Sequence, residues 1–314
     1  MNVLSLFDGI SGGQVALKRV GIKVDNYYGS EVDEYAIKIA EKNFPNMISI
    51  GDIRKVSYKE GILYSENGIY EVGKIDLIMA GSPCQSLSFA GKQKGLATSE
   101  NIKILTLEDY LYYKENDYTF SGQSYLFWEF IRILREVNPK YFLLENVNMS
   151  AEWKEVFTRT VGVEPIRINS NLVSAQNRDR LYWTNISNKI EQPKDRGILL
   201  RDILIEEVDE KNLYPLSKAH YDGFMRSYPH WKESPIDGKS KPILASYYKQ
   251  PPHCPYVKSK TSESGYRRLS AVECERLQTL DDNYTEGVSN SQRLKTIGNG
   301  WTIEVIVHIL SYIK

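Results

Sequence analysis

The sequence predicts an α/β fold with a doubly wound, mostly parallel sheet and a second, small and irregular module. Short apolar runs alternate with segments long enough to form helices, which is typical of a parallel sheet covered on both faces. This alternation stops at about residue 190, where short polar stretches rich in proline begin, and it returns near residue 266. We therefore expect one domain formed by 1–190 and 266–314 and another formed by 191–265.

The expected strands are short runs of apolar or aromatic residues. Five lie at 2–7, 24–30, 47–50, 75–80 and 141–145, and two more lie at 164–173 and 181–186. The segments between the first five are long enough for the crossovers that parallel strands need.

Helices are indicated by apolar residues three and four positions apart. The expected helices begin at Gln14 and cover 32–43, 125–137 and 299–313. Pro45 and Pro139 follow the second and third helices as stops. Ser270, with Glu273 three residues later, matches the capping box that opens a further helix.

Composition restricts the class of protein. Of the 314 residues, 41% are hydrophobic and 25% are charged, as in ordinary globular proteins. No apolar run approaches the roughly 20 residues of a membrane span. The N-terminal segment 1–7 is expected to be a strand and not a signal peptide, and three cysteines indicate a reducing compartment. We therefore expect a cytoplasmic protein without a membrane partner.

Charge is distributed unevenly along the chain, although the formal net charge is zero. Residues 211–268 contain eleven Lys or Arg against four Asp or Glu, and they are rich in tyrosine. Alternating basic and aromatic residues suit phosphate contacts and base stacking. A solvated, loop-rich face explains the same charge equally well.

Cys84 follows the apolar run 75–80 within a Gly-Ser-Pro-Cys turn. Strand ends followed by such turns are where α/β enzymes place reactive groups, and a thiol there is a nucleophile if its pKa is lowered. The alternative is a small hydrophobic residue buried at a turn. His253 and Cys254 are too isolated to form a zinc site, so no metal is expected.

A glycine-rich loop, Asp8–Gly13, follows the first expected strand and opens a helix. Glycines allow close backbone approach to a ligand, although a plain tight turn explains the loop nearly as well. Glu31 ends the second strand, where an acidic side chain can bind both hydroxyls of a ribose. Asp52 and Ile53 follow the third strand and suit an adenine amino group and ring. Together these residues indicate an adenosine-bearing cofactor.

At this point the sequence resembles the DNA (cytosine-5) methyltransferase family nearly from end to end. The resemblance is carried by ordered motifs at 7–13, Glu31, Asp52, 83–85, 126–129, 145–147, 176–180, 268–280 and 298–301. It implies the Rossmann-like fold of S-adenosylmethionine-dependent methyltransferases, with 191–265 as a target recognition domain. The implied reaction is methylation of carbon 5 of a flipped-out cytosine in a specific duplex DNA sequence.

The resemblance also implies roles for four catalytic residues. Cys84 adds to carbon 6 of cytosine, Glu145 donates to ring N3 and accepts from the amino group, Arg180 holds the cytosine carbonyl, and Arg178 helps to fix the site.

Further positions follow from the resemblance and from the local charge. For S-adenosylmethionine these are Phe7, Asp8, Gly9, Ile10, Gly12, Gly13, Glu31, Val32, Asp52, Ile53, Ser82, Pro83, Leu126, Asn299 and Trp301. For DNA they are Gln85, Ser86, Lys92, Lys239, Lys241, Lys249, Lys258 and Lys260. We expect a monomer, with a cognate restriction endonuclease as a candidate partner.

Two alternatives stay open at this level. One branch of the family uses the same motifs on tRNA, and a catalytically silent nucleic-acid binder could keep the same fold. The chain also carries an insertion near 98–122, relative to compact members of the family. That insertion could contact DNA or a protein, or be a tolerated surface addition.

Overall fold

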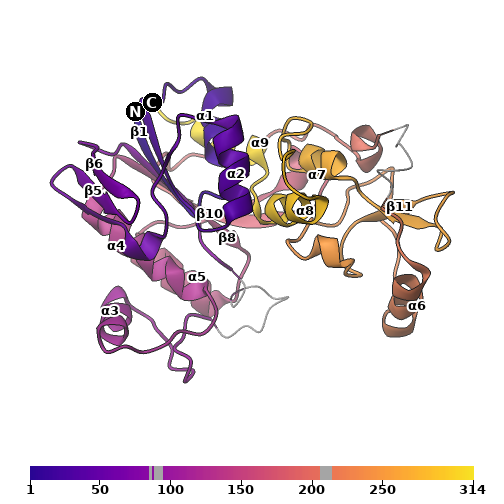
Figure 1. Ribbon diagram of the computed structural model, residues 1–314, viewed down its shortest axis with the longest axis horizontal. Coiled ribbons are helices and arrows are strands. Elements are labelled where there is room, and N and C mark those ends of the chain that lie inside the picture. The colour runs from indigo at the N-terminus through magenta and orange to yellow at the C-terminus, as the bar shows by residue number, and fades with distance from the viewer. Residues whose placement is uncertain (85–86, 88–94, 206–213) are drawn as a thin grey trace.

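The computed structural model describes residues 1–84, 87, 95–205 and 214–314. Within them, the centre is a seven-stranded sheet in the order β3-β2-β1-β7-β8-β10-β9 (Figure 1). Its strands are β1 (Asn2–Leu6), β2 (Asn26–Ser30), β3 (Ile48–Ser49), β7 (Leu77–Gly81), β8 (Tyr141–Val147), β9 (Ile166–Asn169) and β10 (Asp179–Thr184). The first five run parallel, and β10 pairs antiparallel with both β8 and β9. The prediction of a mostly parallel sheet is confirmed.

The strand order reverses between β1 and β7. From β1 the chain proceeds through β2 to β3 on one side, and β7 is followed by β8 on the other. In open α/β sheets, ligands bind outside the carboxyl ends of the strands at such a point. The loops that leave this edge contain Phe7–Ser11 after β1 and Ser82–Cys84 after β7.

Helices cover both faces of the sheet. The helices α1 (Gly12–Val20), α2 (Glu34–Asn43) and α9 (Ile303–Leu310) share a core with one face, and α4 (Phe127–Val137) and α5 (Ala151–Val161) share a core with the other. In β7, Leu77 and Met79 belong to the first core, whereas Ile78 and Ala80 belong to the second. Successive side chains of a strand point to opposite faces, so an apolar run of this kind is what a doubly covered strand requires.

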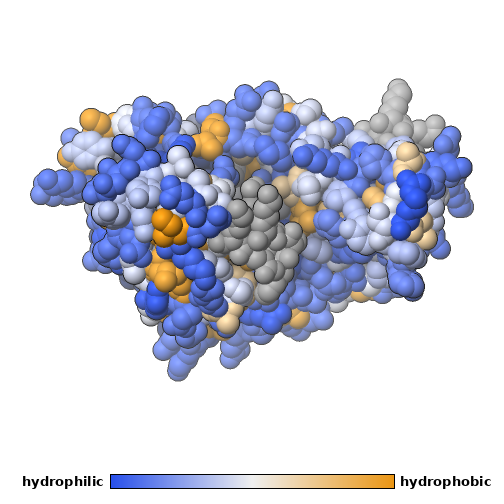
Figure 2. All heavy atoms as spheres, turned by 90° about the horizontal axis from the view of Figure 1, so that it is seen from below, coloured by the Kyte–Doolittle hydropathy of each residue, from blue (hydrophilic) through white to orange (hydrophobic). Residues whose placement is uncertain are grey.

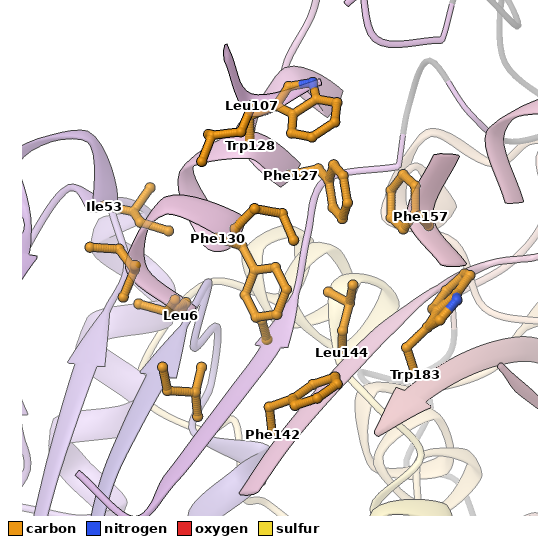
Figure 3. Packing of buried hydrophobic residues seen from close by; sticks show 14 of the residues in the cluster. Leu6, Ile53, Leu107, Phe127, Trp128, Phe130, Phe142, Leu144, Phe157 and Trp183 are labelled. Atoms are coloured by element: carbon orange, nitrogen blue, oxygen red, sulfur yellow. The ribbon is translucent and has the colours of Figure 1, made fainter. Parts of the chain in front are cut away.

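Aromatic side chains fix α4 and α5 on the sheet (Figure 3). The rings of Phe127 and Phe157 stack with centroids 3.7 Å apart, and Trp183 of β10 lies 5.3 Å from Phe157. Phe130 and Leu144 pack in the same cluster. Each fully buried side chain of this size contributes about 1.5–3 kcal/mol. This packing holds the end of β8, which carries Glu145.

Several elements were not expected from the sequence. Among them are the antiparallel strands β4 (Ser57–Lys59), β5 (Ile62–Ser65) and β6 (Gly68–Glu71), and the helices α3 (Leu107–Glu115), α5, α6 (Lys218–Ser227) and α8 (Asn290–Asn299). The strands are short and mix polar with apolar residues, so their period of two is weak. The segment 164–173 is a strand only at β9, because Asn169 caps the 3-10 helix η3 (Ser170–Leu172).

The expected final helix is present as α9, but it is shorter than the predicted 299–313. Helix α8 ends at Asn299, Gly300 is extended, and α9 begins only at Ile303. The break has a physical cause, since the carbonyls of Gly298 and Gly300 accept hydrogen bonds from Arg178. The capping box of α7 (Ala271–Leu277) is confirmed, because Ser270 Oγ accepts from Glu273 N and Glu273 Oε2 accepts from Ser270 N.

A second lobe lies beyond α7 and α8 in Figure 1, where α6 and β11 (Tyr256–Lys258) are labelled. β11 pairs with β12 (Tyr266–Arg268), and the 3-10 helices η4 (Leu200–Ile203) and η6 (Tyr247–Lys249) belong to the same region. A third core joins this lobe to α7 and α8, and it includes Tyr247, Tyr256, Cys274 and Ile297. Apart from α6, most of the described part of 191–265 is irregular. The domain boundaries at 190 and 265 stay a prediction.

Among the described residues, no helix is both long and apolar enough to cross a lipid bilayer. The face seen in Figure 2 is mostly hydrophilic, and the hydrophobic residues described there lie in small separate patches. Scattered hydrophobic residues of this kind are ordinary on a protein surface and do not form a broad apolar patch.

Candidate active site

The turn after β7 is held against the end of β8. Asn146 Nδ2 donates to Ser82 Oγ at 2.9 Å and to the Ser82 carbonyl at 3.1 Å, and all of these groups are buried. Cys84 lies half-buried at the end of this turn. The thiol is therefore presented by a backbone that two hydrogen bonds fix.

The charges around Cys84 control its ionisation. Burial raises the pKa of the Cys84 thiol, and the carboxylate of Glu145 raises it further, whereas Arg180 and Arg178 act in the opposite direction. In this arrangement the thiol is protonated at neutral pH. Because Glu145 contributes to the shift, neutralising that carboxylate favours the thiolate.

Glu145 is buried at the point where three strands meet. It pairs with Gly81 of β7 on one side and with Tyr182 of β10 on the other. Arg180 Nε lies 3.0 Å from Glu145 Oε1, and Trp301 Nε1 donates to Glu145 Oε2 at 3.2 Å. The carboxylate is thus oriented by one donor on each oxygen.

The two predicted arginines have different surroundings. Arg180 pairs with Glu145, whereas the buried Arg178 donates to the carbonyls of Ile243, Gly298 and Gly300 at 2.9, 3.2 and 2.9 Å. Burial, together with Arg180, lowers the pKa of Arg178 to about 10, so its guanidinium is still charged at neutral pH. Arg178 therefore joins the second lobe to the end of α8.

An open cleft lies beside the carboxyl ends of β1 and β2. Of the predicted cofactor residues, it is lined by Phe7, Glu31, Val32, Asp52, Ile53 and Leu126. Ser30, Arg54, Gln123 and Tyr125 line it as well, and sequence reasoning missed them. Each of these four residues lies within three sequence positions of a predicted cofactor residue. Proximity to those residues is the signal that could have identified them.

The acidic residues of this cleft are held in place by hydrogen bonds. Glu31 accepts from the backbone N–H groups of Gly9, Val32 and Asp33 at 2.8, 2.8 and 2.9 Å. Asp52 accepts from Arg54, whose Nε lies 3.0 and 2.8 Å from its two oxygens. Burial acts to raise the pKa of Asp52, but the hydrogen bonds from Arg54 outweigh this effect and lower the pKa below its usual value.

The remaining predicted cofactor residues do not line this cleft. They are Asp8, Gly9, Ile10, Gly12, Gly13, Ser82, Pro83, Asn299 and Trp301. Gly12 and Gly13 allow α1 to pack closely, since a β-carbon there would lie 2.9 Å from Ile303 and 2.6 Å from Met79. Asp8 accepts a bond from Tyr27 at 2.6 Å and another from Ser11, and burial raises its pKa to about 6.

The predicted DNA-binding lysines fall into two groups. Lys239 Nζ donates to the carbonyls of Ser174 and Ile198, and Lys241 Nζ donates to the carbonyl of Lys232. By contrast, three lysines are exposed, namely Lys249, Lys258 and Lys260. Gln85, Ser86 and Lys92 lie outside the described residues. Within the described ranges, no group of three or more His, Cys, Asp or Glu side chains could hold a metal ion.

Comparison with known proteins gives a consistent result. A family model described as C-5 cytosine-specific DNA methylase matches residues 1–161 and 169–314. The Type II methyltransferase M1.ScrFI of Lactococcus lactis subsp. cremoris is 26% identical over 97% of this chain and 75% of its own length. The Type II methyltransferase M.NlaX of Neisseria lactamica is 24% identical over 99% of this chain and 96% of its own length. The crystal structure of S. pombe Dnmt2 methyltransferase has a similar fold, with a TM-score of 0.67 at 17% identity over 99% of this chain and 97% of that one.

Proposed function

The chain belongs to the C-5 cytosine-specific DNA methylase family and is a DNA (cytosine-5)-methyltransferase, and we propose that it acts through a covalent bond from Cys84 to a flipped-out cytosine. The observation that carries this proposal is the Arg180–Glu145 ion pair, whose charges act on the neighbouring thiol of Cys84. A base stacked in a duplex cannot reach a site at the edge of a sheet, so the cytosine must leave the helix.

The chemistry accounts for the choice of residues. Carbon 5 of cytosine is a poor nucleophile, and addition of the Cys84 thiolate at carbon 6 makes it enamine-like. Glu145, as its acid, donates to N3 while the ring gains electron density, and Arg180 donates to the cytosine carbonyl. The thiol proton of Cys84 would pass to the Glu145 carboxylate, which forms the thiolate and the acid in one step and removes one cause of the raised pKa of Cys84.

We propose that the cleft holds S-adenosylmethionine. Glu31 would accept from the ribose, Asp52 from the adenine amino group, and Phe7 would pack against the adenine ring. When bound, this cofactor supplies an electrophilic methyl group. After carbon 5 has gained the methyl group, loss of its proton and departure of the Cys84 thiolate restore the aromatic ring. The fit is supported by the fixed carboxylate of Glu31 and by the position of the cleft beside the carboxyl ends of β1 and β2.

We propose that 191–265 selects the target sequence. Its support is the local excess of positive charge together with exposed lysines at 249, 258 and 260. Phosphate contacts of this kind position the duplex, and side chains at base edges then read the sequence.

We further propose a monomer in the cytoplasm of a bacterium or a phage-infected cell, with a cognate restriction endonuclease in the same system. The support for the restriction system is that two relatives aligned over nearly the whole chain carry the name Type II methyltransferase.

Transfer of labelled methyl groups from S-adenosylmethionine tests the proposed function. Duplex DNA and tRNA are offered separately, and the labelled base is identified after hydrolysis. We expect label in 5-methylcytosine of duplex DNA. Label only in tRNA would overturn the choice of substrate, and label in neither would overturn the catalytic proposal.

A further inference from the structure

We propose that Trp301 is a positioning residue whose indole N–H fixes Glu145 for the reaction, and that position 81 is glycine because it must leave room for this contact. The inference rests on the proposed function, since it concerns the carboxyl group that acts on the cytosine. It gives Trp301 a role at Glu145 that is separate from closing a cofactor pocket.

The contact is specific to one oxygen of the carboxylate. Trp301 Nε1 donates to Glu145 Oε2 at 3.2 Å, and Arg180 Nε lies 3.0 Å from Oε1. A carboxylate offers about four lone-pair sites, so two are left after these donors are counted. A cytosine requires two, one to carry the proton given to N3 and one to accept from the amino group. The two protein donors therefore fix the carboxyl plane without competing with the base.

Gly81 makes this arrangement possible. A β-carbon on Gly81 would stand 2.9 Å from Trp301 Nε1 and 3.3 Å from Glu145 Oε2. Such approaches are shorter than ordinary contacts, so a methyl group at 81 would push the indole and the carboxylate apart. Gly81 has no positive φ that would otherwise call for glycine. The need to leave space for the contact between Trp301 and Glu145 therefore explains why position 81 is glycine.

The backbone around Trp301 is held from both sides. The Gly300 carbonyl accepts from Arg178 at 2.9 Å and from Gln278 at 3.1 Å, and Thr302 Oγ1 donates to Gln278 Oε1 at 2.8 Å. Arg178 and Gln278 are buried. Buried and satisfied polar networks of this kind are rigid, so the indole meets Glu145 from a fixed direction.

Trp301→Phe tests the inference, because it keeps an aromatic ring and removes only the N–H donor. We expect the single-turnover methylation rate, at saturating DNA and S-adenosylmethionine, to fall about tenfold, while the cofactor Kd changes less than about threefold. In a Glu145→Gln background the same substitution should change the residual rate less than about twofold, because coupled residues are not additive. Gly81→Ala should reproduce the loss of rate with a folded protein.

Trp183→Phe is the matched control. Its indole also donates one hydrogen bond, at 3.1 Å to Thr158 Oγ1, but it lies in the core below α5. We expect this variant to lose stability and to keep its single-turnover rate. The inference fails if Trp301→Phe weakens cofactor binding and leaves the saturated rate unchanged, or if the effects of Trp301→Phe and Glu145→Gln multiply. If the parent itself transfers no methyl group to DNA, the proposed function fails and the inference fails with it.

Discussion

The backbone of Leu244 lies against Gly298 so closely that a β-carbon at 298 would stand 2.3 Å from the Leu244 carbonyl carbon. Leu244 belongs to the second lobe and Gly298 to α8 of the sheet lobe. Arg178 connects the two lobes at the same place, because it donates hydrogen bonds to the carbonyls of Ile243 and Gly298. The two lobes thus meet through backbone contacts that leave no room for a side chain.

Gly298→Ala is expected to lower the free energy of unfolding by about 1–3 kcal/mol, since the clashing atoms are backbone and cannot rotate away. Urea denaturation checks this. Gly223→Ala on α6 is the control, because only Arg226 Nη2, at 4.0 Å, lies near the added methyl group. There we expect no loss of stability, because alanine is the better helix former. If the two substitutions changed the free energy of unfolding equally, the close approach of the Leu244 backbone to Gly298 would be contradicted.

Tyr110→Phe tests the role of the insertion near 98–122. Tyr110 of α3 is 1% exposed, and its hydroxyl donates to the fully buried Glu129 of α4, which also binds Lys114 and Arg132. We expect the variant to lose about 1–3 kcal/mol of stability, because a buried carboxylate loses a donor.

Tyr112→Phe on the same helix is the control for the insertion. Tyr112 is 59% exposed, so the change should stay within about 0.5 kcal/mol in thermal or urea unfolding. If Tyr110→Phe were equally neutral, the insertion would be a surface addition and not part of the core.

The sheet and the position of Cys84 could be predicted because they depend on local signals. Apolar runs mark the strands, and the turn after 75–80 presents the cysteine whatever packs around it. The break between α8 and α9 could not be predicted, because it depends on Arg178, which is 120 residues from Gly298 in the chain. The same holds for Trp301, whose partner Glu145 is 156 residues away. Sequence periodicity carries no information on such distant pairs.

The lysines of the predicted target recognition domain show the same limit of prediction from sequence. Charge counting cannot separate Lys239, whose ammonium binds two carbonyls, from exposed Lys258. The structure separates them by their partners.

Combined replacement of Lys249, Lys258 and Lys260 by Gln is expected to weaken DNA binding and to flatten its salt dependence, by up to about one unit for each phosphate that is no longer neutralised. Cofactor affinity should barely change. Lys239→Gln, by contrast, should lower stability, because two partly buried carbonyl partners lose their donor. Binding titrations at several salt concentrations check both. An unchanged salt slope for the triple variant, with collapsed S-adenosylmethionine binding, would place this segment in the catalytic core.

Glu31→Ala is expected to weaken S-adenosylmethionine binding by about 1–3 kcal/mol, the usual free-energy scale of hydrogen bonds to a charged group. Calorimetry measures this directly. Glu34→Ala removes the same charge from an exposed position on α2 that does not line the cleft, so it should bind like the parent. Unchanged affinity for Glu31→Ala would move the cofactor site elsewhere.

The most direct measurement of the central claim is methyl transfer to duplex DNA by Cys84→Ala, compared with the parent and with Cys274→Ala. Cys274 is a buried thiol of α7 in the core that joins α7 and α8 to the second lobe, so its loss should affect stability and not chemistry. We expect Cys84→Ala to bind S-adenosylmethionine like the parent and to show no methyl transfer, because the covalent bond to carbon 6 can no longer form. A rate for Cys84→Ala within about tenfold of the parent would contradict covalent catalysis by this cysteine.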